Sequence, residues 1–138
     1  MRFLDRLQPL ALLVLRVALG AIMIAHGAQK LFGGMQKFEG VVSGAGIPWW
    51  VAYVAAITEF AAGILLLVGL LTRLASLAIF SEMCVAIAKF HWKNGLAAPQ
   101  GKGFDFPLAC AAIAFALIFF GAGPISLDWA LGRGGGNK

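Results

Sequence analysis

Four long apolar segments dominate this sequence, and they constrain its fold more than any other feature. About twenty helical residues, at a rise of roughly 1.5 Å each, cross the hydrocarbon core of a bilayer. The sequence therefore predicts an all-α integral membrane protein, a four-helix transmembrane bundle with up-down topology, in a single domain over residues 1–131. The glycine-rich tail, 132–138, is expected to be disordered. The predicted helices run over about 9–32, 49–71, 74–91 and 106–123.

The composition argues against a soluble domain. Of the 138 residues, 61% are hydrophobic and 12% are charged, whereas soluble domains carry about 25% charged residues. The net charge of +5 is scattered over chain ends and loops, without a basic stripe interleaved with aromatic residues. We therefore expect no nucleic-acid partner, and we expect the basic residues to lie at the surface of the lipid bilayer.

The connectors indicate the topology. Thr72 and Arg73 leave room only for a tight antiparallel hairpin between the second and third helices. A short interfacial helix is expected at about 35–43, and Asp105 is expected to cap the fourth helix. Arg16 interrupts the first apolar segment, so we interpret this segment as a retained helix and not as a cleaved signal peptide. The distribution of basic residues favours both termini in the cytoplasm.

Three ionisable residues lie inside the apolar segments: Arg16, Glu59 and Glu82. Such a side chain at bilayer depth costs about 2.5–3.5 kcal/mol on insertion scales, so it needs a partner or an aqueous pocket. Their depths nearly coincide in an up-down bundle, which predicts a buried charge cluster of Arg16 with both glutamates. One arginine cannot neutralise two carboxylates, so either one glutamate is protonated or another cation, such as Lys89 or a bound ligand, joins them. The cluster either locks the helices in register or belongs to a functional site.

A histidine- and lysine-containing mouth is predicted on one side of the membrane. His26, Lys30, Lys89 and His91 all lie toward the side of the first and third loops, where they would form a ligand-binding entrance above the glutamates. The alternative is that His26 and Lys30, and likewise Lys89, only anchor helix ends by snorkelling. No metal site is expected. Haem ligation by His26 and His91 is the less favoured reading, because the sequence has no haem attachment motif.

Two cysteines and a tryptophan pair receive structural interpretations. Cys84 and Cys110 lie in apolar segments without CxxC or metal-type spacing, and we interpret them as inert buried thiols and not as a redox pair. Trp49 and Trp50 are interpreted as part of an interfacial aromatic belt.

Several stretches of the chain, in order, resemble the DoxX family of small bacterial membrane proteins. The stretches are LRVALGAIMIAHGAQKLFGG, TEFAAGILLLVGLLTRLASLAI and GAGPISLDWAL, and the similarity covers about residues 10–131. KFHWKNG and GFDFP are similar to the family's histidine-containing helix end and its acidic-plus-proline helix entry, which fall on His91 and Asp105. The resemblance implies a four-helix, multi-pass protein of the bacterial inner (plasma) membrane. It also implies a link to membrane redox systems, since some relatives are associated with thiosulfate oxidation with quinone or with superoxide-detoxifying enzymes.

Three functions remain open at this point. The first is a redox-linked integral membrane subunit that interacts with quinone. It would be an oxidoreductase subunit, and its partner in a membrane redox complex would supply the electrons. No intrinsic cofactor is expected in that case. The second is a non-catalytic accessory or scaffold subunit of a larger membrane complex. The third is a small-molecule carrier, which ranks last because the sequence has no inverted repeat or pair of broken helices.

Overall fold

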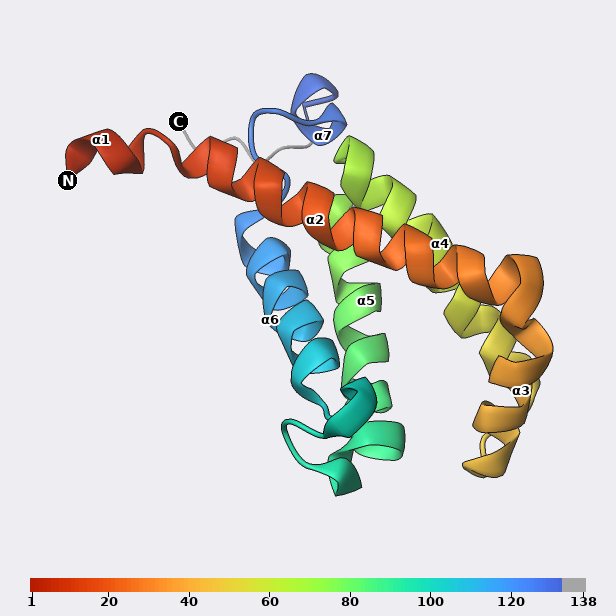
Figure 1. Cartoon of the computed structure of the whole chain (residues 1–138). Helices are drawn as coiled ribbons and strands as arrows, with labels where there is room; N and C mark the ends of the chain where they lie inside the picture. The colour runs from red at the N-terminus through yellow and green to blue at the C-terminus, as the bar shows by residue number, and fades with distance from the viewer. Residues whose placement is uncertain (133–138) are drawn as a thin grey trace.

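The computed structural model describes residues 1–132, whose regular secondary structure is entirely helical (Figure 1). The α-helices are α1 (Arg2–Asp5), α2 (Gln8–Gln29), α3 (Met35–Gly44), α4 (Trp50–Val68), α5 (Thr72–Ala86), α6 (Asp105–Phe120) and α7 (Leu127–Ala130). A kinked segment, η1 (Lys30–Gly34), follows α2, with non-helical backbone angles at Phe32 and Gly33. A wider π-helical turn, η2 (Ile87–His91), follows α5, and two short turns form η3 (Trp92–Asn94) and η4 (Pro99–Gly101). The predicted all-α fold is confirmed. Apart from Gly132, the tail that was expected to be disordered lies outside the described residues.

The helix lengths support a membrane bundle. Within residues 1–132, three helical stretches are long and apolar enough to cross a bilayer: Gln8–Gly44, Trp50–Val68 and Thr72–Asn94. By contrast α6 has 16 residues, a rise of about 24 Å, which is less than the roughly 30 Å of the hydrocarbon core. The predicted fourth membrane-spanning helix is therefore present as a shorter apolar helix, and its length does not confirm the full up-down arrangement.

Two helices end earlier than predicted because glycine changes the backbone direction. Helix α4 ends at Val68, where Gly69 adopts the left-handed conformation with φ of +73°. Helix α6 ends at Phe120, where Gly121 has φ of +73°. Glycine has no Cβ and adopts a positive φ at little cost. The positive φ takes the chain out of the helical conformation, so the helix stops there.

Two local predictions about the loops have different outcomes. The expected interfacial helix at 35–43 is present as α3. The expected cap of the fourth helix is wrong by one position: Phe104 occupies the N-cap, and Asp105 is the first helical residue. The Asp105 carboxylate accepts a hydrogen bond from the Phe106 amide at 2.9 Å, and its charge still favours a helix N-terminus.

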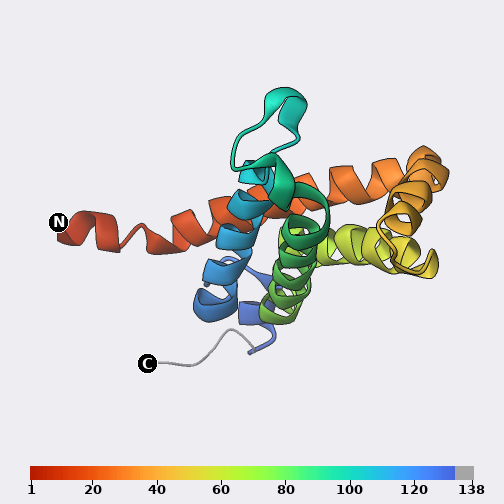
Figure 2. The same cartoon turned by 90° about the horizontal axis from the view of Figure 1, so that it is seen from below.

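The helices pack as two close pairs, α2 with α4 and α5 with α6. Both views show α5 and α6 side by side while α2 crosses the bundle (Figures 1 and 2). Glycines allow the α2–α4 contact, because a Cβ on Gly20 would lie only 2.8 Å from the Gly63 carbonyl oxygen. Small residues are typical of close helix contacts in membranes. The core between the pairs includes Leu19, Met23, Leu66, Ile79, Met83 and Leu117.

Substituting Gly27 with alanine should loosen the α2–α4 pair. The new Cβ would lie 2.6 Å from the Phe60 nitrogen and 2.9 Å from the Phe60 Cα, and these backbone atoms can move only if the helix moves. We expect a loss of about 1–3 kcal/mol, as for other overpacked interiors, measured as a lower melting temperature in detergent. Gly40→Ala in α3 is the matched control, since its Cβ would meet nothing within 4 Å. Equal melting temperatures for the two variants would contradict the close contact.

Candidate functional site

Arg16 lies where the turn between α4 and α5 meets the segment after α6, and only 2% of it is exposed. Its Nη1 donates a hydrogen bond to the Ala122 carbonyl oxygen at 2.7 Å, and its Nη2 donates one to the Ile125 carbonyl oxygen at 2.8 Å. A Cβ on Gly69 would lie 2.9 Å from the guanidinium carbon. Arg16 therefore ties α2 to two segments that are distant in the sequence.

The predicted cluster of Arg16 with Glu59 and Glu82 is not formed. Arg16 reaches the end of α4 at Gly69, and Glu59 lies ten residues earlier, which is about 15 Å along a helix. Two of the three guanidinium nitrogens, Nη1 and Nη2, donate to backbone carbonyls, while the buried Nε has no partner among the described residues. The sequence argument failed because it placed the three residues at one depth from their positions within each segment and ignored where α2 crosses α4.

Asp128 is the residue at this end of the bundle that the sequence analysis missed. Its two carboxylate oxygens accept hydrogen bonds from the amides of Leu71 (2.8 Å) and Thr72 (2.9 Å), and its own amide donates to the Gly69 carbonyl at 2.8 Å. The carboxylate thus caps the first turn of α5. The sequence did contain a signal for Asp128, because an acidic residue stands within the apolar stretch ISLDW.

At the opposite end of α2, Lys30 forms an ion pair with Glu59. The Nζ to Oε1 distance is 2.6 Å, and Glu59 is 4% exposed. The Lys30 ammonium also lies 4.1 Å from the centroid of the Phe38 ring, a cation–π contact that holds it over α3. Lys30 is therefore the cation that the sequence analysis required for Glu59, in place of Arg16.

Glu82 adds a second carboxyl group to this pair. Its side chain lies within hydrogen-bonding reach of the Glu59 carboxyl. Among the described residues, no donor faces Oε2 of Glu59 or Oε2 of Glu82, and both atoms are buried. Glu59 and Glu82 also line the same cavity. Two carboxyl groups share one lysine, which leaves an uncompensated acceptor inside the bundle.

Two cavities meet at this group of residues. One has a volume of about 490 Å³ and is lined by Lys30 and Glu59 together with His26, His91, Phe106 and Pro107, among others. The second has a volume of about 250 Å³, and Lys30, Glu59, Glu82 and His91 also line it. The ion pair therefore belongs to a wall that both cavities share. His26, Lys30 and His91, three of the four residues of the predicted mouth, line the larger cavity, and their role as a ligand entrance stays a prediction.

Lys89 is the member of the predicted mouth that the structure leaves out. Its side chain is exposed and lines neither cavity. The cysteines also differ from each other: both are free thiols, Cys110 is buried as predicted, and Cys84 is exposed on the outer face of α5. Trp49 and Trp50 are exposed, as expected for an aromatic belt.

Two irregular helical turns bring Lys30 and His91 to the cavities. Lys30 begins η1, and His91 ends η2. Lys30 still has helical backbone angles and directly precedes a kink at Phe32 and Gly33. His91 closes the π-helical turn η2, and such turns are frequent at functional sites. His91 Nδ1 also lies 3.2 Å from the Lys102 carbonyl oxygen, which holds the imidazole against the third loop.

The apolar walls of the larger cavity were not predicted as site residues. Met23, Met83, Phe106 and Pro107 line it beside the polar groups. The Phe106 ring lies against the His26 imidazole with ring centroids 5.2 Å apart. Nothing in the sequence separates these residues from the core, because a cavity wall and a packed core use the same apolar side chains.

Long apolar helices around an ion-paired, partly apolar cavity define a small multi-pass helical membrane protein. The sequence model of the family named DoxX matches residues 11–92, which is more than half of the chain. The chain belongs to the DoxX family, and the resemblance noted from its motifs is thereby confirmed.

Relatives of known name are similar over most of their length. An uncharacterized protein of Haemophilus influenzae is 30% identical over 93% of this chain and 96% of its own, and the inner membrane protein YphA of Escherichia coli K12 is 32% identical over 88% and 90%. A Bacillus subtilis protein named "Putative oxidoreductase CatD" is 33% identical over 76% of each chain. No solved structure gives a significant match.

Replacing Arg16 with methionine should destabilise the protein independently of the glutamates. The change removes two charge-assisted hydrogen bonds, each worth about 1.5–3 kcal/mol, and it should lower the melting temperature in detergent by several degrees. Because Glu59 is distant, the effects of Arg16→Met and Glu59→Gln should add within about 0.5 kcal/mol in a double-mutant cycle. If Glu59→Gln rescued the stability of Arg16→Met, Arg16 would interact with Glu59 as the sequence predicted, and the pairing of Arg16 with backbone carbonyls would be refuted.

Replacing Lys30 with methionine should be rescued by neutralising its partner. The single change leaves Glu59 buried without a cation, which costs about 3–5 kcal/mol in soluble proteins and less in membranes. The double variant Lys30→Met, Glu59→Gln should recover part of the lost melting temperature. Lys89→Met, on an exposed residue of the same charge, should leave stability unchanged. A Lys30→Met variant as stable as Lys89→Met would show that the ion pair contributes nothing.

Proposed function

We propose that this protein is a redox-linked membrane subunit whose larger cavity binds the ring of a quinone. The observation that carries the proposal is the Lys30–Glu59 ion pair, which forms a polar wall shared by two otherwise largely apolar cavities. Small-molecule sites typically combine apolar walls with a few convergent polar groups, in cavities of about 300–1,000 Å³. The larger cavity falls in that range.

The cavity offers the chemistry that a quinone requires. A quinone ring is flat and apolar, with carbonyl oxygens that accept hydrogen bonds. Lys30 and the histidines His26 and His91 supply donors for these oxygens. The Phe106 ring supplies an aromatic face for the quinone ring. In this proposal the electrons come from a redox partner protein, since reduction of a quinone to a quinol takes two electrons and two protons.

The two glutamates have the arrangement of a proton donor. An ionised carboxylate only accepts hydrogen bonds, so two carboxyl groups within hydrogen-bonding reach of each other are satisfied when one of them holds a proton. With Lys30 balancing the other, the group carries no net charge. Glu82 would then hold a proton that passes through Glu59 to the reduced quinone oxygen, and a proton from the aqueous side would replace it.

The names of the relatives agree with this proposal. One is described as an oxidoreductase and another as an inner membrane protein. By similarity we place this chain in the bacterial inner membrane as a multi-pass protein. Its basic residues favour the orientation with both termini in the cytoplasm.

The test is the small molecule that the protein retains. The protein, purified from its own membranes in mild detergent, should release a quinone on solvent extraction, identified by mass spectrometry. A short-chain ubiquinone analogue should bind at least about tenfold more weakly to Lys30→Met than to wild type, since a lost charge-assisted hydrogen bond is worth about 1.5–3 kcal/mol. Lys89→Met, outside the cavity, should bind like wild type.

Other results would overturn the proposal. Equal affinity of Lys30→Met and Lys89→Met for the analogue would place the binding elsewhere. A purified protein that holds a stoichiometric protein partner but no quinone, and binds no analogue, would be an accessory or scaffold subunit. A strong Soret band in its absorption spectrum would assign His26 and His91 to haem.

A further inference from the structure

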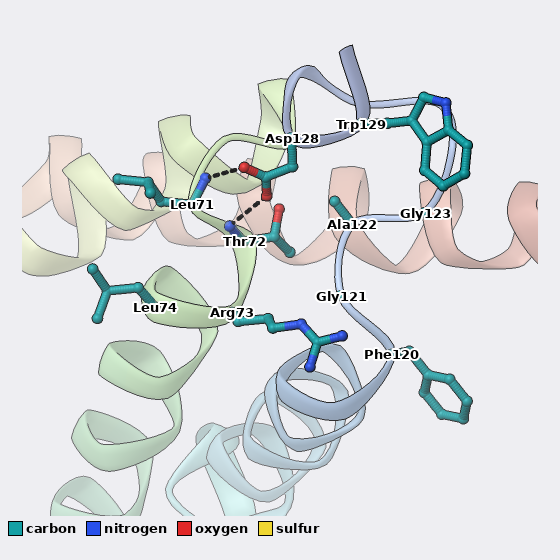
Figure 3. A pocket seen from close by; sticks show the side chains of 10 residues that line it. All are labelled: Leu71, Thr72, Arg73, Leu74, Phe120, Gly121, Ala122, Gly123, Asp128 and Trp129. Atoms are coloured by element: carbon teal, nitrogen blue, oxygen red, sulfur yellow. Dashed lines mark hydrogen bonds between the residues drawn. The ribbon is translucent and has the colours of Figure 1, made fainter. Parts of the chain in front are cut away.

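A separate cavity of about 420 Å³ lies at the opposite end of the bundle from the Lys30 site. It is bounded by the turn between α4 and α5 on one side and by the segment that follows α6 on the other (Figure 3). None of its lining residues also lines the cavities around Lys30. The residues used in the argument are Leu74, Phe120, Gly121, Ala122, Gly123 and Trp129, together with Arg73 and Asp128.

Arg73 brings a positive charge to this cavity. It belongs to the first turn of α5, and its guanidinium group lies beside the bare backbone of Gly121, where a Cβ would be 3.2 Å from Nε. Within residues 1–132 the Arg73 side chain has no ion-pair or hydrogen-bond partner. An exposed arginine without a protein partner can form two parallel hydrogen bonds with a phosphate.

The nearby carboxylate does not neutralise Arg73. Both oxygens of Asp128 accept hydrogen bonds from the amides of Leu71 and Thr72, and Asp128 forms no ion pair with Arg73 within residues 1–132. Figure 3 shows Asp128 directed toward these amides, while Arg73 extends toward Gly121. The cavity therefore combines a satisfied carboxylate with an unpaired cation.

Unpaired backbone donors lie beside Arg73. The amides of Ala122 and Gly123 donate no hydrogen bond to the backbone of the described residues, although Ala122 is buried. Backbone amides of folded proteins nearly always have an acceptor. Ala122, Gly123 and Arg73 line one cavity, where a ligand with several acceptor oxygens would serve both the amides and the guanidinium group.

The rim of the cavity is apolar and exposed. Phe120 is 68% exposed, Leu74 is 63% exposed and Trp129 is 53% exposed. Phe120 ends α6, Leu74 lies in the first turn of α5, and Trp129 lies in the short helix α7. Aromatic residues at helix ends are typical of the level of the lipid headgroups. A ligand at this position meets a polar cavity and an apolar rim together, which matches a phospholipid and not a free anion.

We propose that this cavity binds the phosphodiester group of a membrane phospholipid. Arg73 holds the phosphate oxygens, the amides of Ala122 and Gly123 donate to them, and the acyl chains lie along Leu74 and Phe120. Bound there, the lipid joins the first turn of α5 to the segment after α6, and basic pockets between membrane helices bind lipid headgroups in this way. The site is independent of the proposed quinone cavity.

Native mass spectrometry of the full chain in a nonionic detergent tests the proposal. Phosphatidylglycerol, added at increasing concentration, should remain bound to wild type, to Arg6→Gln and to Lys30→Met. Arg6 is the matched control, since it is an exposed arginine that lines none of the cavities described above. Arg73→Gln should weaken retention at least about tenfold, as expected for a lost bidentate charge-assisted contact. If Arg73→Gln fails to fold, Arg73→Lys replaces it, with a loss of several-fold because lysine lacks the planar fork.

Two competitors identify the chemistry. Diacylglycerol lacks the phosphate and should not displace the bound phospholipid, and inorganic phosphate should displace it only at far higher concentration. Displacement by inorganic phosphate at concentrations equal to those of the lipid would refute a lipid site in favour of a free anion site. Equal retention of phosphatidylglycerol by Arg73→Gln and Arg6→Gln would overturn the proposal. The result for the phospholipid site does not depend on quinone binding, so Lys30→Met should retain phosphatidylglycerol even if it loses the quinone analogue.

Discussion

The rest of the structure depends on the hydrogen bonds that the buried Arg16 side chain donates. Arg16 lies within an apolar helix, where an unpaired charge is costly, and two backbone carbonyls after α6 accept its hydrogen bonds. These carbonyls are free because Gly121 and Pro124 prevent the chain from continuing as a helix. The guanidinium group therefore fixes the return of the chain after α6 against α2, and Gly69 leaves the space that the contact needs.

Because Arg16 donates its hydrogen bonds at one end of the bundle, another cation pairs with the glutamates at the other end. Since Arg16 is bound to carbonyls, Lys30 is the cation that faces the glutamates, and it reaches Glu59 from the end of α2. The antiparallel contact of α2 with α4 through glycines places Lys30 near Glu59 and Arg16 near Gly69. The bundle thus has two polar ends of different composition, a carboxyl-rich cavity and an arginine-rich corner.

Much of the fold could be predicted from the sequence because it follows from local patterns. Apolar length predicted the long helices, although α6 ends three residues before the predicted position because Gly121 changes the backbone direction. Counting along the helices placed His26, Lys30 and His91 toward one side of the membrane, and the structure has all three lining one cavity. The partner of Arg16 could not be predicted, because the position along α4 where α2 crosses it depends on which glycines meet. Asp128 and Lys89 were misjudged for the same reason, since burial of a single side chain depends on neighbours that are distant in the sequence.

The sequence by itself determined that this chain is an all-helical membrane protein of the DoxX family with ionisable groups inside its bundle. Hydrophobicity and motif order are properties of short segments, so they can be read without a structure. Only the tertiary structure decided that Lys30 pairs with Glu59, that Glu82 adds a second carboxyl group, and that Arg16 and Asp128 secure the other end. The physical reason is that a charge inside an apolar bundle takes whichever partner the helix crossing brings within hydrogen-bonding distance, and backbone carbonyls and amides serve as well as opposite charges.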